Sequence, residues 1–138
     1  MTDLPAPPKR PNGKPCMLIV EDHAALRAGL CELLGLAFPG HEILEAGSAE
    51  EALNLAFITR PEIVLMDIGL PGMNGIQATR QLKSHLPHTR VVMISIQETD
   101  HYQSAALQAG ASAYLFKRTL HSELVPTVMK LLTNIQSE

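Results

Sequence analysis

The chain has 138 residues, 46% of them hydrophobic, and a formal net charge of −3 at pH 7. This length and apolar content predict one domain with a substantial core, and the absence of a basic stripe argues against direct binding to nucleic acid. The longest apolar runs have about five residues, far fewer than the roughly 20 of a membrane-spanning helix. No apolar segment near the N-terminus indicates a signal peptide.

Prolines dominate the first 15 residues, and five of them lie there: Pro5, Pro7, Pro8, Pro11 and Pro15. Such a segment has too little apolar surface to fold, so residues 1–15 are expected to form a disordered tail. Residues 16–138 form the expected domain. Its two cysteines, Cys16 and Cys31, lie in apolar stretches and are expected to be free thiols, which fits a cytoplasmic protein.

From residue 16 onward, short apolar runs typical of buried strands alternate with helical patterns. Strands are expected at residues 16–21, 41–46, 62–66, 90–95 and 113–116. Helices are expected at residues 24–37, at residues 48–59, from the end of the loop at residues 69–75 to about residue 85, and at residues 100–109. A last helix carries Leu124, Val128, Leu131 and Ile135. Ser48 and Glu51 have the spacing of a capping box. Pro126 is expected to kink the last helix or to shift its start.

The strand runs are almost continuously apolar, which indicates burial on both faces. Such strands are typical of a parallel sheet that is covered by helices on each side. Five successive β/α units with right-handed crossovers leave few possible topologies. We therefore predict an α/β fold of the flavodoxin-like (βα)5 type, a doubly wound five-stranded parallel sheet with strand order 2-1-3-4-5.

Polar side chains follow four of the predicted strands. Glu21 and Asp22 follow the first strand, Asp67 the third, Ser95 ends the fourth, and Lys117 follows the fifth. In the predicted order these strand ends converge on one crevice, where ligands bind in open parallel sheets. Each residue alone is an ordinary loop or cap residue. Three carboxylates, a hydroxyl and a lysine together have the composition of a Mg²⁺-assisted phosphoryl-transfer site.

Over about residues 16–136 the sequence resembles the receiver domain of a two-component response regulator. The resemblance is carried by four segments in order: residues 20–23, residues 67–75, Ser95 and residues 109–117. A further set of residues is similar to the NarL/LuxR-type subfamily: Glu21, Asp22, His23, Arg27, Gly29 and Leu30. Members of that subfamily usually carry a helix-turn-helix domain after the receiver, so the resemblance implies transcription regulation through a DNA-binding domain absent from this chain.

The resemblance implies that Asp67 is the phosphoacceptor. It also implies that Asp22 and Asp67 bind Mg²⁺ directly, that Glu21 acts through a water molecule, and that Gly69 offers its backbone carbonyl. Glu21 replaces the more frequent aspartate of the family and is one methylene longer.

Three further residues are implied to respond to phosphorylation. Ser95 would turn toward the phosphoryl oxygen, and Lys117 would pair first with Asp67 and then with the phosphate. Tyr114 matches the aromatic residue that moves inward when Ser95 moves. Ile96 is bulkier than the small residue usual after the switch hydroxyl, which would narrow access to Asp67.

The implied phosphoryl donor is a sensor histidine kinase or a phosphotransfer protein, and homodimerisation is an implied response. No other enzymatic activity is expected beyond self-phosphorylation and autodephosphorylation. Three alternatives stay open: a stand-alone receiver that acts on a protein partner, a constitutive receiver-like interaction module, and a flavin carrier. The flavin carrier would need phosphate-binding loops at the strand ends, where this chain instead places three carboxylates.

Overall fold

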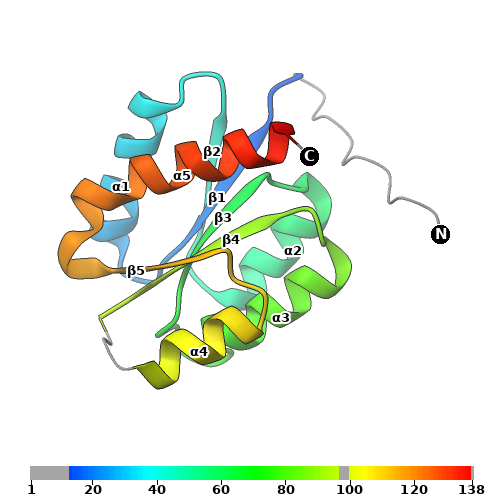
Figure 1. Ribbon diagram of the computed structural model, residues 1–138, viewed down its shortest axis with the longest axis vertical. Helices are drawn as coiled ribbons and strands as arrows, with labels where there is room; N and C mark the ends of the chain where they lie inside the picture. The colour runs from blue at the N-terminus through cyan, green and yellow to red at the C-terminus, as the bar shows by residue number, and fades with distance from the viewer. Residues whose placement is uncertain (1–12, 97–99, 138) are drawn as a thin grey trace.

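The computed structural model describes residues 13–96 and 100–137. Within these ranges the chain forms five strands that alternate with five α-helices (Figure 1). The strands are β1 (Cys16–Val20), β2 (Glu42–Ala46), β3 (Ile63–Asp67), β4 (Arg90–Ser95) and β5 (Ala113–Phe116). The helices are α1 (Ala24–Ala37), α2 (Ala49–Thr59), α3 (Gly75–His85), α4 (Asp100–Gln108) and α5 (Leu120–Ser137), and the 3-10 turn η1 (Lys117–Thr119) precedes α5.

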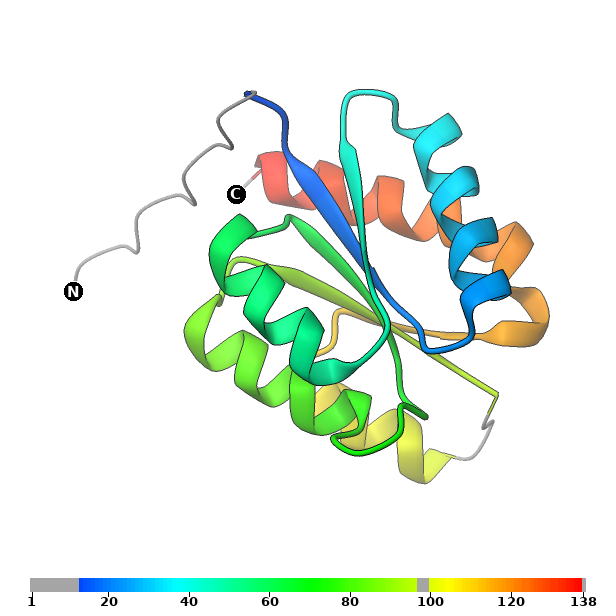
Figure 2. The ribbon, with the colours of Figure 1, turned by 180° about the vertical axis from the view of Figure 1, so that it is seen from behind.

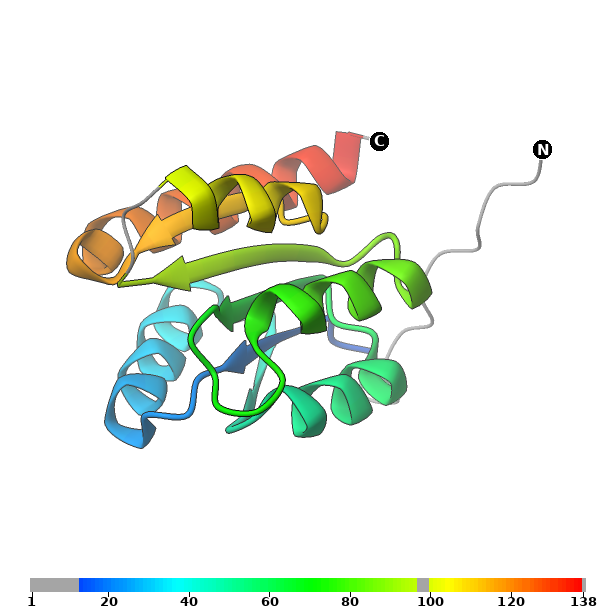
Figure 3. The ribbon, with the colours of Figure 1, turned by 90° about the horizontal axis from the view of Figure 1, so that it is seen from below.

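The five strands form one parallel sheet with the order β2-β1-β3-β4-β5. This result confirms the predicted fold class and strand order. The strand arrows point to the same side of the molecule (Figure 3), so the C-terminal ends of β1, β3, β4 and β5 share one edge. The tail predicted for residues 1–15 lies outside the described residues, apart from residues 13–15.

Two apolar cores lie on opposite faces of the sheet. Helices α1 and α5 cover one face, and α2, α3 and α4 cover the other (Figures 1 and 2). Side chains alternate between faces along a strand, so Leu18 and Val20 join the core beneath α2 and α3, whereas Met17 and Ile19 join the core beneath α1 and α5. Burial on both faces explains why β1 is apolar at every position. Among the described residues, no helix is long and apolar enough to cross a lipid bilayer.

Helix caps differ in detail from the sequence prediction. Ser48 Oγ accepts a hydrogen bond from Glu51 N at 3.1 Å, as predicted. Glu51 Oε1, however, accepts from Gly47 N at 2.8 Å rather than from the backbone of Ser48. A reciprocal capping box instead forms at α3 between Asn74 and Gln77, a pair whose types and spacing fit the known pattern.

Pro126 lies inside α5, six residues after the helix begins at Leu120. The start of the helix is therefore not shifted to the proline. Proline has no N–H to donate, so the carbonyl of Ser122 loses its usual helical partner. Because Pro126 is exposed, water can solvate that carbonyl and the helix continues to Ser137.

Gly75, the first residue of α3, packs directly against the main chain of Asp67. A Cβ atom at Gly75 would clash with the Asp67 carbonyl oxygen and would lie 2.9 Å from Ile68 Cα. Both neighbours are backbone atoms at the end of β3, so neither can rotate away. Because Gly75 has no side chain, the start of α3 can pack directly against Asp67, whose carboxylate lines the cleft.

Gly75→Ala is expected to lower the free energy of unfolding by about 1–3 kcal/mol, because the new methyl group must displace the Asp67 backbone. Urea denaturation followed by circular dichroism measures this change. Gly35→Ala in α1 is the matched control, since a Cβ atom there meets no atom within 4 Å and alanine favours a helix interior by about 1 kcal/mol over glycine. A Gly75→Ala protein as stable as the wild type would contradict the close packing.

Candidate functional site

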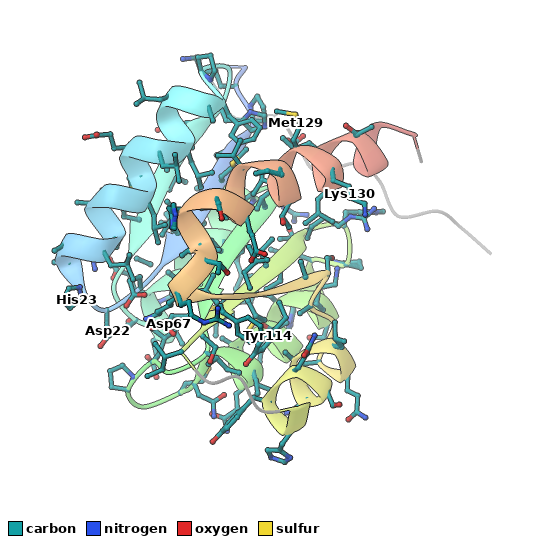
Figure 4. All side chains as sticks on the ribbon, turned by 60° about the vertical axis from the view of Figure 1, so that its left-hand side comes forward. Asp22, His23, Asp67, Tyr114, Met129 and Lys130 are labelled. Atoms are coloured by element: carbon teal, nitrogen blue, oxygen red, sulfur yellow. The ribbon has the colours of Figure 1, made fainter. Side chains whose placement is uncertain are left out.

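Six of the seven predicted site residues line one cleft at the C-terminal edge of the sheet. The cleft has a volume of about 540 Å³. The six residues are Glu21, Asp22, Asp67, Gly69, Ser95 and Lys117. Figure 4 shows Asp22 and Asp67 near each other at this edge, with Tyr114 beyond Asp67 on β5. Tyr114 does not line the cleft.

Asp67 is the last residue of β3 and is only 4% exposed. Its two carboxylate oxygens have different partners. Oδ1 accepts a hydrogen bond from Gly69 N at 3.0 Å, and Oδ2 accepts one from Lys117 Nζ at 3.2 Å. A backbone donor on one oxygen and an ammonium group on the other therefore fix the orientation of this carboxylate.

Glu21 follows β1 and is fully buried. Its Oε2 accepts a hydrogen bond from His23 N at 3.0 Å. Its Oε1 lies 3.0 Å from Lys117 Nζ, but this ion pair is not aligned as a hydrogen bond, and Oε1 accepts none from the described residues. Burial raises the pKa of Glu21, the His23 amide and Lys117 oppose the rise, and Asp67 adds to it. The net shift is upward, so the ionised carboxylate lacks full compensation.

Lys117 is the cation that faces both buried acids. Burial by itself lowers the pKa of Lys117, but the combined attraction of Glu21 and Asp67 outweighs burial and the net shift is upward. The ammonium group therefore stays protonated at neutral pH. It lies 3.0 Å from an oxygen of Glu21 and 3.2 Å from an oxygen of Asp67, and it offsets part of the repulsion between these like charges.

Three carboxylates offer oxygen ligands on one side of the cleft. One oxygen from each of Glu21, Asp22 and Asp67 lies within 4.8 Å of the others. Asp22 is exposed, so a cation can approach from solvent. A ligand set of three anionic oxygens suits a hard divalent cation such as Mg²⁺ better than a soft metal. Glu21 Oε1, which is buried without a hydrogen bond, is an atom that such a cation, through a water molecule bound to it, would satisfy.

Ser95 on β4 and Tyr114 on β5 are offset by two residues in the register of the two strands. Ser95 ends β4, is fully buried, and has Phe116 as its register partner on β5. Tyr114 is instead the partner of Met93, and its ring makes an edge-to-face contact with Phe116 at a centroid distance of 5.7 Å. These side chains share one face of the sheet because they occupy alternate positions. Phe116 is therefore a neighbour of both the predicted hydroxyl and the predicted aromatic residue.

Two residues that contact this region, His23 and Arg27, have no site role predicted from the sequence. His23 lines the cleft, and its Nδ1 accepts a hydrogen bond from Leu26 N at 3.3 Å, which caps α1. Arg27 donates to the backbone carbonyl of Glu21. Histidine is not among the preferred N-cap residues, and the Arg27 contact depends on how α1 folds back, so only the subfamily-like motif singled these residues out. Ile96 lines the same cleft and is 73% exposed.

The sequence itself also matches known proteins. Residues 17–129 match the family model described as the response regulator receiver domain. The chain is 37% identical over 116 residues to the transcriptional activator protein ExaE of Pseudomonas putida, a match that covers 84% of this chain and 54% of that protein. It is 34% identical over 113 residues to the transcriptional regulatory protein DegU of Brevibacillus brevis, covering 81% and 48% respectively. The chain thus spans about half the length of these curated relatives.

Solved structures agree with this assignment. A LuxR-family two-component response regulator from Aurantimonas sp. SI85-9A1 superposes with a TM-score of 0.81 at 33% identity, covering 88% of this chain and 86% of that chain. The receiver domain of the putative response regulator NarL from Mycobacterium tuberculosis gives a TM-score of 0.78 at 30% identity, covering 89% and 96%. These similarities confirm the resemblance to the NarL/LuxR type. The family match extends over most of the chain and agrees with its fold, so the chain belongs to the response regulator receiver domain family of two-component signal transduction.

Proposed function

We propose that Asp67 accepts a phosphoryl group and that phosphorylation switches an interaction surface of the domain. The main support for this proposal is that the buried Asp67 carboxylate contacts Lys117 and lies beside two other acids in a cleft. In the reaction, an Asp67 oxygen forms a bond to phosphorus while the bond from phosphorus to the leaving group of the donor breaks. Lys117 offsets the negative charge on the phosphoryl oxygens.

The proposed metal site uses Asp22 and Asp67 as direct Mg²⁺ ligands, the Gly69 backbone carbonyl as another, and Glu21 through a water molecule. When bound, the ion would neutralise phosphoryl charge and reduce its repulsion from Asp67. The clustering of the three carboxylates within 4.8 Å supports this assignment. The chain itself orients Asp67 through the Gly69 amide and Lys117.

The proposed switch begins when Ser95 turns toward the phosphoryl oxygen. Its departure opens space on the face that Phe116 and Tyr114 share, and the Tyr114 ring is proposed to move into that space. The responding surface is proposed to be the α4–β5–α5 face, where Tyr102 is 39% and Leu107 is 50% exposed. The α1–α5 side is the alternative, and there Met129 is 53% exposed at a distance from Asp67 (Figure 4).

For the whole protein we propose a cytoplasmic response regulator that takes its phosphoryl group from a sensor histidine kinase or a phosphotransfer protein. The receiver domain is proposed to span residues 16–138, with no enzymatic activity other than its own phosphorylation and dephosphorylation. Relatives named as transcriptional regulators are about twice as long as the matched segment. That length difference supports control of a DNA-binding domain, with homodimerisation of the receiver as the response.

Incubation with Mg²⁺ and acetyl phosphate is expected to add one phosphoryl group to the wild type and none to Asp67→Asn, because an amide is not a nucleophile here. Intact-mass spectrometry measures the gain, and tryptic peptides locate it. Glu32→Gln, which removes an exposed acid on α1, is the control and should react like the wild type. Equal modification of Asp67→Asn would remove the assignment, and omission of Mg²⁺ should abolish the reaction.

Lys117→Met is expected to destabilise the metal-free protein by about 3 kcal/mol, because it leaves two buried carboxylates without their cation. Asp67→Asn should instead stabilise it by removing one of the repelling charges. Thermal unfolding of the three proteins across a Mg²⁺ titration measures both effects. Saturating Mg²⁺ should raise the melting temperature of the wild type by mass action and that of Asp67→Asn much less. A wild-type melting curve insensitive to millimolar Mg²⁺ would contradict the metal site.

Ser95→Ala is expected to accept phosphate at Asp67 but to respond weakly. A hydrogen bond to a charged group contributes about 1.5–3 kcal/mol. Its loss should therefore reduce the phosphate-induced increase in the association constant by about tenfold or more. Sedimentation velocity with and without acetyl phosphate measures that shift. Ser95→Thr, which keeps the hydroxyl, is the matched control. Identical shifts in the alanine and wild-type proteins would exclude the proposed coupling.

A further inference from the structure

Arg27 of α1 contacts the ends of two neighbouring strands. Its Nη1 donates a hydrogen bond to the backbone carbonyl of Glu21 at 2.6 Å, just beyond β1. Its Nε donates to Glu45 Oε1 at 3.0 Å, near the end of β2. The Arg27 side chain is 22% exposed, whereas that of Glu45 is 50% exposed. The guanidinium group therefore links α1 to Glu21, one of the acids that line the cleft.

The polar groups of Glu21 are held by three residues, one at the end of β2 and two at the start of α1. Its N–H donates to the Ala46 carbonyl at 3.1 Å, its carbonyl accepts from Arg27, and its Oε2 accepts from His23 N. Oε1 is left without a hydrogen bond, 3.0 Å from Lys117 Nζ. A long glutamate side chain loses considerable rotamer freedom when it is fixed, and these bonds supply the restraint.

The Arg27 bond also bears on Asp22. The peptide unit between residues 21 and 22 is planar, so the direction of the Glu21 carbonyl determines the direction in which the chain enters Asp22. The Arg27 bond thus restrains the backbone path from Glu21 into Asp22, and along that path the Asp22 carboxylate comes within 4.8 Å of oxygens of Glu21 and Asp67.

We propose that Arg27 is a positioning residue for the metal site, acting through the Glu21 carbonyl to hold Glu21 and Asp22 toward one cation. This inference rests on the proposed Mg²⁺ role of those two acids. Arg27 itself touches neither the cation nor the phosphoryl group. Its contribution is to pre-form the ligand arrangement, so that binding does not have to order the segment between β1 and α1.

The charge of Arg27 and its positioning role predict opposite changes in Mg²⁺ affinity when the side chain is removed. The guanidinium group is positive and repels a divalent cation, so removal of its charge alone would tighten Mg²⁺ binding. Removal of a positioning contact would weaken it, and partners that orient metal ligands typically change affinity by about 10–100-fold. Glu45→Gln separates the two Arg27 contacts, because it weakens the exposed ion pair and leaves the Glu21 carbonyl bond intact.

The experiment is isothermal titration of MgCl₂ into the wild type, Arg27→Met, Arg27→Gln, Arg27→Lys and Glu45→Gln, with urea denaturation of each protein alongside. Both neutral variants are expected to bind Mg²⁺ about tenfold more weakly. Arg27→Lys keeps one donor and should recover part of the loss. Glu45→Gln should stay within about twofold of the wild type, since exposed ion pairs contribute little.

Four results would overturn the positioning role. These are wild-type or tighter Mg²⁺ binding by the neutral variants, a lysine variant no better than methionine, an equal loss in Glu45→Gln, and failure of both neutral variants to fold, which would make Arg27 purely structural. Absence of Mg²⁺ binding by the wild type is a distinct result, because it would refute the proposed metal site itself.

Discussion

Lys117 Nζ lies 3.0 Å from Glu21 Oε1 and 3.2 Å from Asp67 Oδ2, and the acidic cleft depends on this shared contact. Two buried carboxylates lose hydration and repel each other, and the ammonium group between them offsets part of both costs. Strands in a sheet are about 4.8 Å apart, and β4 separates β5 from β3. The four-carbon stem of lysine spans that gap, and the extra methylene of glutamate extends the reach from β1.

The sheet separates structural stability from chemical reactivity along each strand. Every residue of β1 and β3 is buried, and the apolar ones pack into cores on both faces. In β1 and β3 the acidic side chains appear only at the last strand position or just beyond it, and there the backbone supplies the first restraints, such as the Gly69 amide on Asp67. Gly75 shows how tightly this edge is packed, since α3 begins against the carbonyl of Asp67. The rigid cores thus hold like-charged groups close together despite their mutual repulsion.

Around the acids lies a second set of contacts that connects the cleft to the rest of the molecule. On one side, Arg27 joins Glu21 to α1 and β2. On the other, Ser95 is the register partner of Phe116, whose ring contacts Tyr114. The Arg27 contacts favour a fixed arrangement of metal ligands. The Phe116 and Tyr114 rings instead lie on a half-buried edge strand, where alternative packing costs less free energy. This difference fits the proposed division between a preformed metal site and a movable output surface.

The fold class, the strand order and six of the residues that line the cleft could be predicted from the residue pattern. Continuous apolar runs require burial on both faces, and the crossover rule then brings the ends of β1, β3, β4 and β5 together. Which atoms meet depends on tertiary packing. The ion pairs of Lys117 with Glu21 and Asp67 join three strand ends, and the place of Phe116 beside Ser95 depends on strand register. Residue pattern predicts which face and which end of the sheet a side chain occupies, but these contacts join segments that lie far apart in the sequence.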